Sequence, residues 1–176
     1  IFMGLMLERS GLAESLMKNF VQVFGRFRGG LAIAAILIGI LFAASTGIVG
    51  ASVVLLTVLA MPIMLEQGYS KSLAAGVLAS SGTLGILIPP SIMLVIMADQ
   101  LSLSVGDLFL GAVMPGLILG VLYIVYVLVT AAVNPKAAPA PTHLEPLTFS
   151  VILRTLISVL PPLILIFAVL GTIFFG

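Results

Sequence analysis

The 176-residue chain has no cysteine, no tryptophan and one histidine, His143. It therefore has no disulfide framework, thiol catalyst or cysteine zinc site, and one histidine cannot form a histidine cluster for a metal. Charged residues are also scarce, at 7% of the sequence against about 25% in ordinary soluble domains. Seven Lys and Arg against six Asp and Glu give a net charge of +1, which excludes the basic surface of a nucleic-acid binder.

Apolar residues are what the chain has in abundance. They make up 61% of the sequence, and the mean hydropathy is +1.37, values that exclude a disordered linker and indicate an integral membrane protein. The chain begins without an initiator methionine and ends inside an apolar run. We expect an internal fragment of a larger polytopic protein, in which residues 1–7 end one truncated transmembrane helix and residues 149–176 start the next.

The first polar stretch carries six of the thirteen charges, between Glu8 and Arg28. Apolar residues, among them Leu16 and Phe20, recur between these charges at roughly helical spacing. This pattern predicts an amphipathic arm over residues 8–30 that lies in the membrane interface. The alternative is a plain polar loop.

Residues 31–65 form a run of 35 residues without a charge. A transmembrane helix needs about 20 residues, so the run is too long for one ordinary span and short for two spans with a turn. The sequence Ala-Ser-Thr-Gly-Ile-Val-Gly at residues 44–50 lies near its middle and concentrates hydroxyls and glycines. The run therefore predicts a re-entrant helical hairpin, which enters the membrane and returns to the same face.

The distribution of Lys and Arg supports the re-entrant interpretation. If residues 31–65 return to the side on which they entered, all seven Lys and Arg lie on one side of the membrane. If the run crosses instead, they divide four against three. Since basic residues concentrate in cytoplasmic loops, the sequence places the opening of the hairpin in the cytoplasm.

The next apolar segment, residues 66–98, contains Gly82, Gly85, Pro89 and Pro90 near its middle. Proline has no backbone N–H and disfavours helix in the preceding residue, so we predict a broken transmembrane helix. Residues 99–133 are predicted to form a short outer loop and a transmembrane helix. Residues 134–148, with four prolines, are predicted to form a cytoplasmic loop. Asp99 is expected in the outer loop or at a helix end, and Tyr69, Tyr123 and Tyr126 are interpreted as interface anchors.

Two irregular stretches in neighbouring membrane segments predict a site. Irregular backbone within a membrane must be buried in protein or line a cavity. Carbonyl and hydroxyl oxygens at such breaks are suitable Na⁺ ligands, and the N-termini of half-helices attract anionic groups. Residues 44–50 facing residues 80–91 would thus form a cation and substrate site. The alternative is that the Ser-Thr-Gly stretch is a packing patch and the two prolines form a structural kink.

An ordered series of motifs resembles one transporter family. Gly-Arg-Phe-Arg-Gly-Gly at residues 25–30 leads to Phe-Ala-Ala-Ser-Thr-Gly-Ile-Val-Gly at residues 42–50. Gly-Thr-Leu-Gly-Ile-Leu-Ile-Pro-Pro-Ser follows at residues 82–91, and Gly-Asp-Leu-Phe-Leu-Gly-Ala-Val-Met-Pro-Gly at residues 106–116. The series is similar to the large membrane subunit of tripartite ATP-independent periplasmic (TRAP) transporters, over nearly the whole chain.

The resemblance implies an all-α polytopic membrane protein that carries the first inverted repeat of an elevator-type transporter. It implies Na⁺-coupled import of small organic acids, mostly carboxylates, across a bacterial or archaeal cytoplasmic (inner) membrane. The implied partners are a periplasmic solute-binding protein and a small membrane subunit. It further implies that the Na⁺ ligands come from Ser45, Thr46, Gly47, Gly50, Gly82, Thr83, Gly85 and Pro89, and that the substrate contacts Ser45, Thr46, Pro90 and Ser91.

The sequence leaves three other functions as alternatives. A channel subunit would use the re-entrant segment as a filter. A purely structural subunit would assemble through Gly116 and Gly120. An enzyme is the weakest alternative, because no nucleophile and base or carboxylate pair falls in one plausible pocket.

Overall fold

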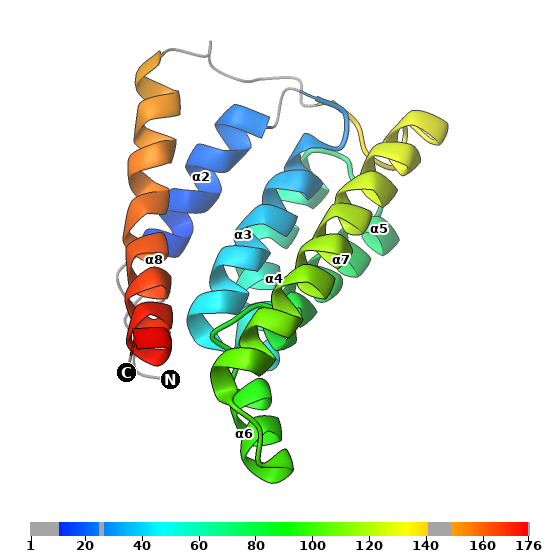
Figure 1. The fold of residues 1–176 in the computed structure, drawn as a ribbon. Coiled ribbons are helices and arrows are strands. Elements are labelled where there is room, and N and C mark those ends of the chain that lie inside the picture. Colours follow the sequence, from blue (N-terminus) through cyan, green and yellow to red (C-terminus); the bar gives the residue numbers. More distant parts are fainter. Residues whose placement is uncertain (1–10, 25–26, 141–148, 176) are drawn as a thin grey trace.

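The structure is a computed structural model that describes residues 11–24, 27–140 and 149–175. Every regular element in these ranges is a helix (Figure 1). The elements are α2 (Leu12–Phe24), α3 (Gly30–Thr46), α4 (Val49–Glu66), α5 (Lys71–Thr83), the short 3-10 helix η1 (Leu84–Ile86), α6 (Ile92–Leu101), α7 (Val105–Val133) and α8 (Phe149–Phe175). The predicted all-α membrane fold is confirmed. The expected helix end at residues 1–7 and the residues around His143 lie outside the described ranges.

Helices α3 and α4 form a helical hairpin over residues 30–66. Its turn consists of Gly47 and Ile48. Gly47 has a φ of +63°, a conformation that glycine adopts without the steric cost that other residues bear, and Ile48 is extended with φ −124°. The hairpin corresponds to the charge-free run that the sequence singles out. The 18 residues of α4 are long and apolar enough to span a membrane, so whether the hairpin is re-entrant stays a prediction.

The segment after the hairpin is broken in two. Helix α5 starts after Ser70, whose hydroxyl accepts a hydrogen bond from the Leu73 N–H at 3.3 Å, as N-cap serines do. The helix continues through Gly82 and Thr83, and η1 follows directly. Residues 87–91 then have no helical assignment, and they include a cis peptide bond between Pro89 and Pro90. The break is thus narrower than the predicted stretch of residues 80–91, because its first residues stay helical.

The connection from α6 to α7 consists of residues 102–104 alone. Ser102 ends α6 in the left-handed region, with φ 53°, and the Ser104 hydroxyl accepts from the Asp107 N–H at 3.4 Å to cap α7. Asp99, which the sequence places in the outer loop or at a helix end, lies near the C-terminal end of α6. Helices α7 and α8, like α4, are long and apolar enough to span a membrane.

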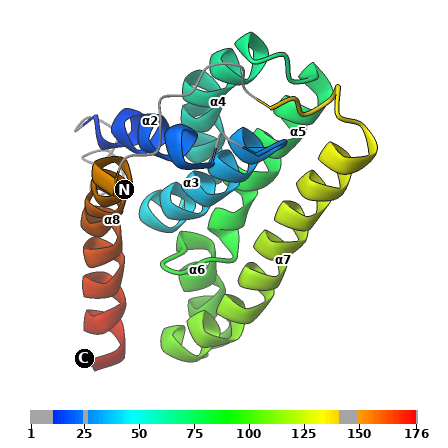
Figure 2. The ribbon, with the colours of Figure 1, turned by 90° about the horizontal axis from the view of Figure 1, so that it is seen from above.

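Helix α3 lies at the centre of the molecule. It packs against α2, α4, α5, α7, α8 and η1 (Figure 2). Small residues on α3 permit this crowding, because Ala32, Ala34 and Ala35 are fully buried. Phe42 is also buried, near the hairpin turn. The interior of the protein is therefore built around the first helix of the hairpin.

Helix α2 connects α8 with this central helix. Leu16, Met17 and Phe20 are buried on α2, and α2 packs against both α3 and α8. The Asn19 side-chain amide donates a hydrogen bond to the Ser158 hydroxyl of α8 at 2.8 Å. The segment predicted as an interfacial arm thus contains an amphipathic helix that packs against α3, α4 and α8.

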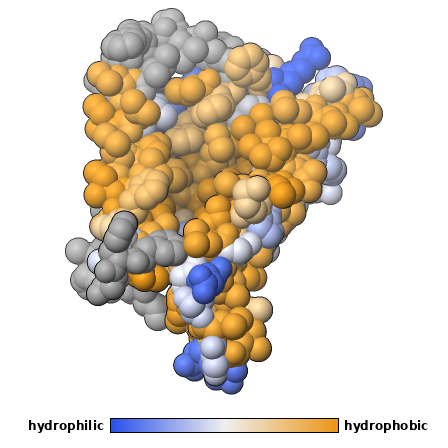
Figure 3. Space-filling model, viewed as in Figure 1, coloured by the Kyte–Doolittle hydropathy of each residue, from blue (hydrophilic) through white to orange (hydrophobic). Residues whose placement is uncertain are grey.

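The outer surface of the long helices is apolar. Large side chains such as Leu117, Val121 and Leu122 are exposed along α7, and Figure 3 shows apolar residues over α7 and α8, with hydrophilic residues toward the ends of the molecule. Tyr69 differs from its predicted role as an interface anchor. It is 4% exposed within the main core, and this burial raises the pKa of its hydroxyl.

Candidate functional site

The turn of the hairpin touches the break in the α5–α6 segment. A Cβ atom built on Gly47 would lie 3.2 Å from the Pro90 carbonyl oxygen and 3.4 Å from the Ile92 backbone nitrogen. A side chain at this residue would therefore press on the break, and glycine lets the two backbones approach. The two irregular stretches that the sequence pairs as a site are indeed neighbours in the fold.

A chain of hydrogen bonds stabilises the hairpin turn. The hydroxyls of Thr46 and Ser52 are 2.6 Å apart, and the Ser52 hydroxyl donates to the Ile48 carbonyl at 3.1 Å. The Ile48 N–H donates in turn to the Thr46 hydroxyl at 3.4 Å. Either hydroxyl can donate to the other, because the Thr46 hydroxyl also lies 3.5 Å from the Ile48 carbonyl and can donate to it. The two hydroxyls and the Ile48 backbone therefore form one hydrogen-bonded group at the turn.

Ser52 is a site residue that sequence reasoning missed. It is fully buried on the first turns of α4, and its hydroxyl connects the last residue of α3 to the turn. The sequence shows Ser52 only as a hydroxyl six residues after Thr46 in an otherwise apolar run. Ser52 reaches Thr46 because of the tight turn at Gly47. The periodicity of apolar residues alone does not predict that turn.

Glycines allow the residues at and next to the break to pack closely against α4 and α7. Gly82 lies so close to α4 that a Cβ atom there would collide with the Val53 side chain and approach its backbone nitrogen to 3.0 Å. A Cβ on Gly116 of α7 would lie 3.4 Å from the Leu87 carbonyl oxygen. Gly85 is buried within η1. The break is thus packed from α4 on one side and α7 on another.

Ser91 carries an unsatisfied polar atom at this junction. Its side chain is 1% exposed, and its hydroxyl has no hydrogen-bond partner among the described residues. Although Ser91 directly precedes α6, it makes no side-chain capping bond to that helix. A buried hydroxyl without a partner costs about 1–3 kcal/mol. The Ser91 hydroxyl is therefore a buried polar group without a partner in the described residues, directly before the N-terminus of α6.

The structure separates the predicted site residues into two sets. Thr46, Gly47, Pro90 and Ser91 meet where the turn contacts the break. Ser45 belongs to the last turn of α3 and Pro89 to the break, next to this contact. Gly50 is exposed with nothing within 4 Å of its Cβ position. The exposed Thr83 donates its hydroxyl proton to the Ser80 carbonyl of its own helix at 2.7 Å, so its oxygen retains only acceptor capacity.

The chemistry of the junction is that of neutral oxygen atoms. Within the described residues there is no group of three or more His, Cys, Asp or Glu side chains that could hold a metal. Divalent cations such as Ca²⁺ and Mg²⁺ are held with carboxylates. Carbonyls of unwound helices and hydroxyls instead suit a monovalent cation such as Na⁺. The junction can also offer the α6 N-terminus to an anion.

Irregular backbone buried between packed membrane helices is typical of transport proteins, and comparison with known proteins places the chain in that class rather than among enzymes. All of residues 1–176 match the family described as "Tripartite ATP-independent periplasmic transporter, DctM component". The chain belongs to this family, as its motifs predicted.

Three relatives illustrate the match. The C4-dicarboxylate TRAP transporter large permease protein DctM of Vibrio cholerae is 41% identical over 128 residues, covering 73% of this chain and 28% of the relative. Its counterpart of the same description in Pseudomonas aeruginosa is 42% identical over 137 residues, covering 78% and 32%. The isethionate TRAP transporter permease protein DctMQ of Oleidesulfovibrio alaskensis is 34% identical over 123 residues, covering 70% and 19%. The chain therefore spans about a third or less of these relatives.

Proposed function

We propose that this chain is part of the large permease subunit of a TRAP transporter that imports small organic acids together with Na⁺. A periplasmic solute-binding protein would deliver the substrate, and a small membrane subunit would complete the transporter in a bacterial or archaeal inner membrane. Family membership supports the transporter. The contact between the hairpin turn at Gly47 and the break at Pro90 is the observation that carries the proposed site.

The Na⁺ site is proposed between the turn and the break. In this proposal the turn contributes oxygens from Ser45, Thr46, Gly47 and Gly50, and the broken segment contributes those of Gly82, Thr83, Gly85 and Pro89. The neutral hydroxyl and carbonyl oxygens of the junction support it. The close packing of Gly82 on Val53 also supports the proposal, because helices packed this closely would keep water away from the ion.

The substrate is proposed to lie beside this ion, against Ser45, Thr46, Pro90 and Ser91. The relatives above are described as transporting C4-dicarboxylates and isethionate. The first carry carboxylate groups and the second a sulfonate group. An acid group would accept hydrogen bonds from the Ser91 hydroxyl and from the first N–H groups of α6, whose dipole favours negative charge. This interaction would satisfy the hydroxyl that has no partner in the described residues.

Alternating access is proposed to be of the elevator type, in which α3, α4, α5 and η1 move as one block. Rigid movement of this block is supported by its packing. Gly82 contacts Val53 across α4 and α5, and Gly39 of α3 lies against Ser81 of α5 closely enough to leave no space for a Cβ atom. Side chains that interlock this closely move together more readily than they slide past one another.

The proposal is tested by uptake into proteoliposomes that contain the full-length permease with its small subunit. Radiolabelled C4-dicarboxylate and isethionate are offered with and without a Na⁺ gradient, and with and without a solute-binding protein. Uptake that requires both the gradient and the binding protein is the expected result. Uptake or ionic current that needs neither would contradict the proposal and favour a channel that uses the hairpin as a filter.

A further inference from the structure

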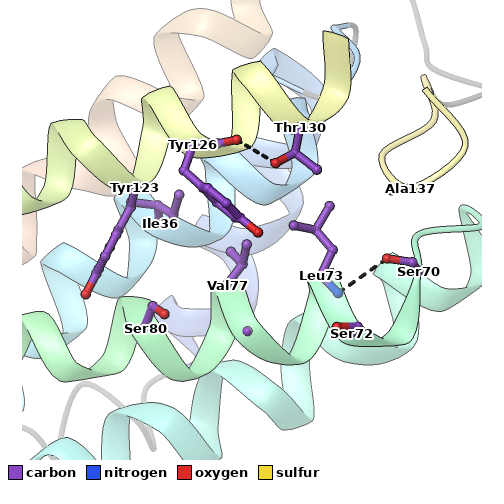
Figure 4. Close-up of a pocket in the computed structure, with 11 residues that line it drawn as sticks. Ile36, Ser70, Ser72, Leu73, Val77, Ser80, Tyr123, Tyr126, Thr130 and Ala137 are labelled. Atoms are coloured by element: carbon purple, nitrogen blue, oxygen red, sulfur yellow. Dashed lines mark hydrogen bonds between the residues drawn. The ribbon is translucent and has the colours of Figure 1, made fainter. Parts of the chain in front are cut away.

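A groove between α5 and α7 forms a cavity of about 550 Å³, separate from the junction of turn and break (Figure 4). Its floor is apolar, since Ile36 of α3 and Leu73 and Val77 of α5 are buried beneath it. Gly76 lines the groove, is exposed, and has nothing within 4 Å of its Cβ position. The groove is therefore open at the surface of this chain and is not an enclosed cavity.

Hydroxyl groups line the two walls above this floor. Tyr123 and Tyr126 project from α7 toward α5, and Ser72 and Ser80 lie on α5 (Figure 4). The hydroxyls of these four residues make no hydrogen bond to another residue in the described part of the chain. Polar side chains at membrane depth are costly without partners and commonly mark a bound molecule or a water-filled cavity. The groove thus presents an apolar floor with polar walls, which suits an amphiphile.

Two lysines neighbour groove-lining residues in the sequence, at the end of the groove where α5 begins. Lys71 stands between Ser70 and Ser72, and Lys136 precedes Ala137, another lining residue. The Ser70 N–H donates a hydrogen bond to the Ala137 carbonyl at 3.0 Å, so the two lysine-bearing segments are held together there. Both lysines are exposed.

The balance of charge at this end favours an anion. Glu66 is the nearest acidic residue along the chain and ends α4, and Arg28 just before α3 adds a further exposed cation. Among the described residues near this end, basic side chains thus outnumber acidic ones. By the distribution of Lys and Arg, this end of the molecule faces the cytoplasm.

The depth of the groove matches one leaflet of the membrane. Ser70 and Ser80 lie ten residues apart, about 15 Å along α5 at 1.5 Å per residue. Half of the hydrocarbon core is also about 15 Å thick. We propose that the groove binds one anionic phospholipid of the cytoplasmic leaflet. Its phosphate lies near Lys71 and Lys136, its ester oxygens face the wall hydroxyls, and one acyl chain runs along the floor.

Native mass spectrometry of the full-length permease with its small subunit tests this proposal. The protein is delipidated in detergent and titrated with dioleoyl phosphatidylglycerol or with dioleoyl phosphatidylcholine, which has the same acyl chains but no net charge. We expect Gly76→Leu to retain one phosphatidylglycerol fewer than the unsubstituted protein, because the leucine occupies the groove without a clash. Replacing Lys71 and Lys136 with Gln should weaken phosphatidylglycerol binding about fivefold per lysine and leave phosphatidylcholine unaffected.

Gly111→Leu is the matched control. Gly111 is exposed on α7, outside the groove, and also has nothing within 4 Å of its Cβ position. Equal phosphatidylglycerol retention by the Gly76 and Gly111 variants would overturn the proposal. So would a lower melting temperature of Gly76→Leu than of Gly111→Leu in lipid-free detergent, because that loss would mean that a protein segment, not a lipid, fills the groove. Neither readout depends on transport.

Discussion

Gly82 of α5 and Val53 of α4 are in such close contact that even a methyl group at residue 82 would overlap the Val53 side chain. Their contact joins the second helix of the hairpin to the helix that leads into the break. It therefore sets the distance between the two halves of the proposed Na⁺ site. Small residues at helix interfaces commonly serve this purpose in membranes.

Gly82→Ala should separate these helices and abolish Na⁺-dependent uptake while the protein still inserts into the membrane. Overpacking of this kind costs about 1–3 kcal/mol, which thermal unfolding of the full-length protein would report as a lower melting temperature. Adding Val53→Ala should restore part of the loss. The rescue stays partial because the Val53 Cα and backbone nitrogen still lie 3.0 Å from the new methyl group. Full activity of the single variant would contradict the site assignment.

Gly47→Ala should also eliminate uptake, for a different reason. The residue has φ +63°, which L residues other than glycine adopt at a cost of about 1 kcal/mol or more, and its methyl group would press on the Pro90 carbonyl at 3.2 Å. We expect that the turn and the break no longer come together to form the proposed site. The measurement is a loss of Na⁺-dependent uptake at normal expression. Gly171→Ala on α8, where nothing lies within 4 Å, is the control and should transport normally.

The sequence predicted the main helices because their signals are local. The charge-free run and its Ser-Thr-Gly centre indicate the hairpin, and Pro89 with Pro90 indicates the break, since both lack the N–H that a helix needs. That the two stretches meet followed from the need to bury irregular backbone within a membrane. Each of these inferences depends on chemistry visible in a few neighbouring residues.

The sequence could not specify features that depend on tertiary contacts. Gly82 was predicted to help unwind the helix, yet it remains helical and provides close packing on Val53. Tyr69 was expected at the interface, yet it is buried. Ser52 was overlooked because a serine within an apolar helix is not informative until its partner, Thr46, is known.

The hydrogen bond between Asn19 and Ser158 should couple α2 to α8 by a measurable amount. Side-chain hydrogen bonds between membrane helices average about 0.6 kcal/mol and reach about 1.7 kcal/mol. A double-mutant cycle with Asn19→Ala and Ser158→Ala, measured by unfolding of the full-length protein, should give a coupling energy in that range. Additive effects of the two substitutions would show that the 2.8 Å contact does not stabilise the pair.

Ser91→Ala separates a structural role of this hydroxyl from a ligand-binding role. The Ser91 hydroxyl is buried and has no partner in the described residues, so its removal should leave the stability measured without Na⁺ and substrate unchanged or raise it by about 1 kcal/mol. When Na⁺ and substrate are added together, the unsubstituted protein should gain stability by binding them, in proportion to the logarithm of their concentrations. The variant should gain less, because it has lost one of the groups that contact the substrate.

Melting temperatures of both proteins, measured over a titration of Na⁺ with and without a C4-dicarboxylate, test this expectation. A smaller shift for the variant only when the dicarboxylate is present would assign Ser91 to the substrate. A smaller shift with Na⁺ alone would assign it to the ion instead. Lower stability of the variant in the absence of both, with unchanged shifts, would mean that the hydroxyl stabilises the fold through a partner and does not contact either ligand.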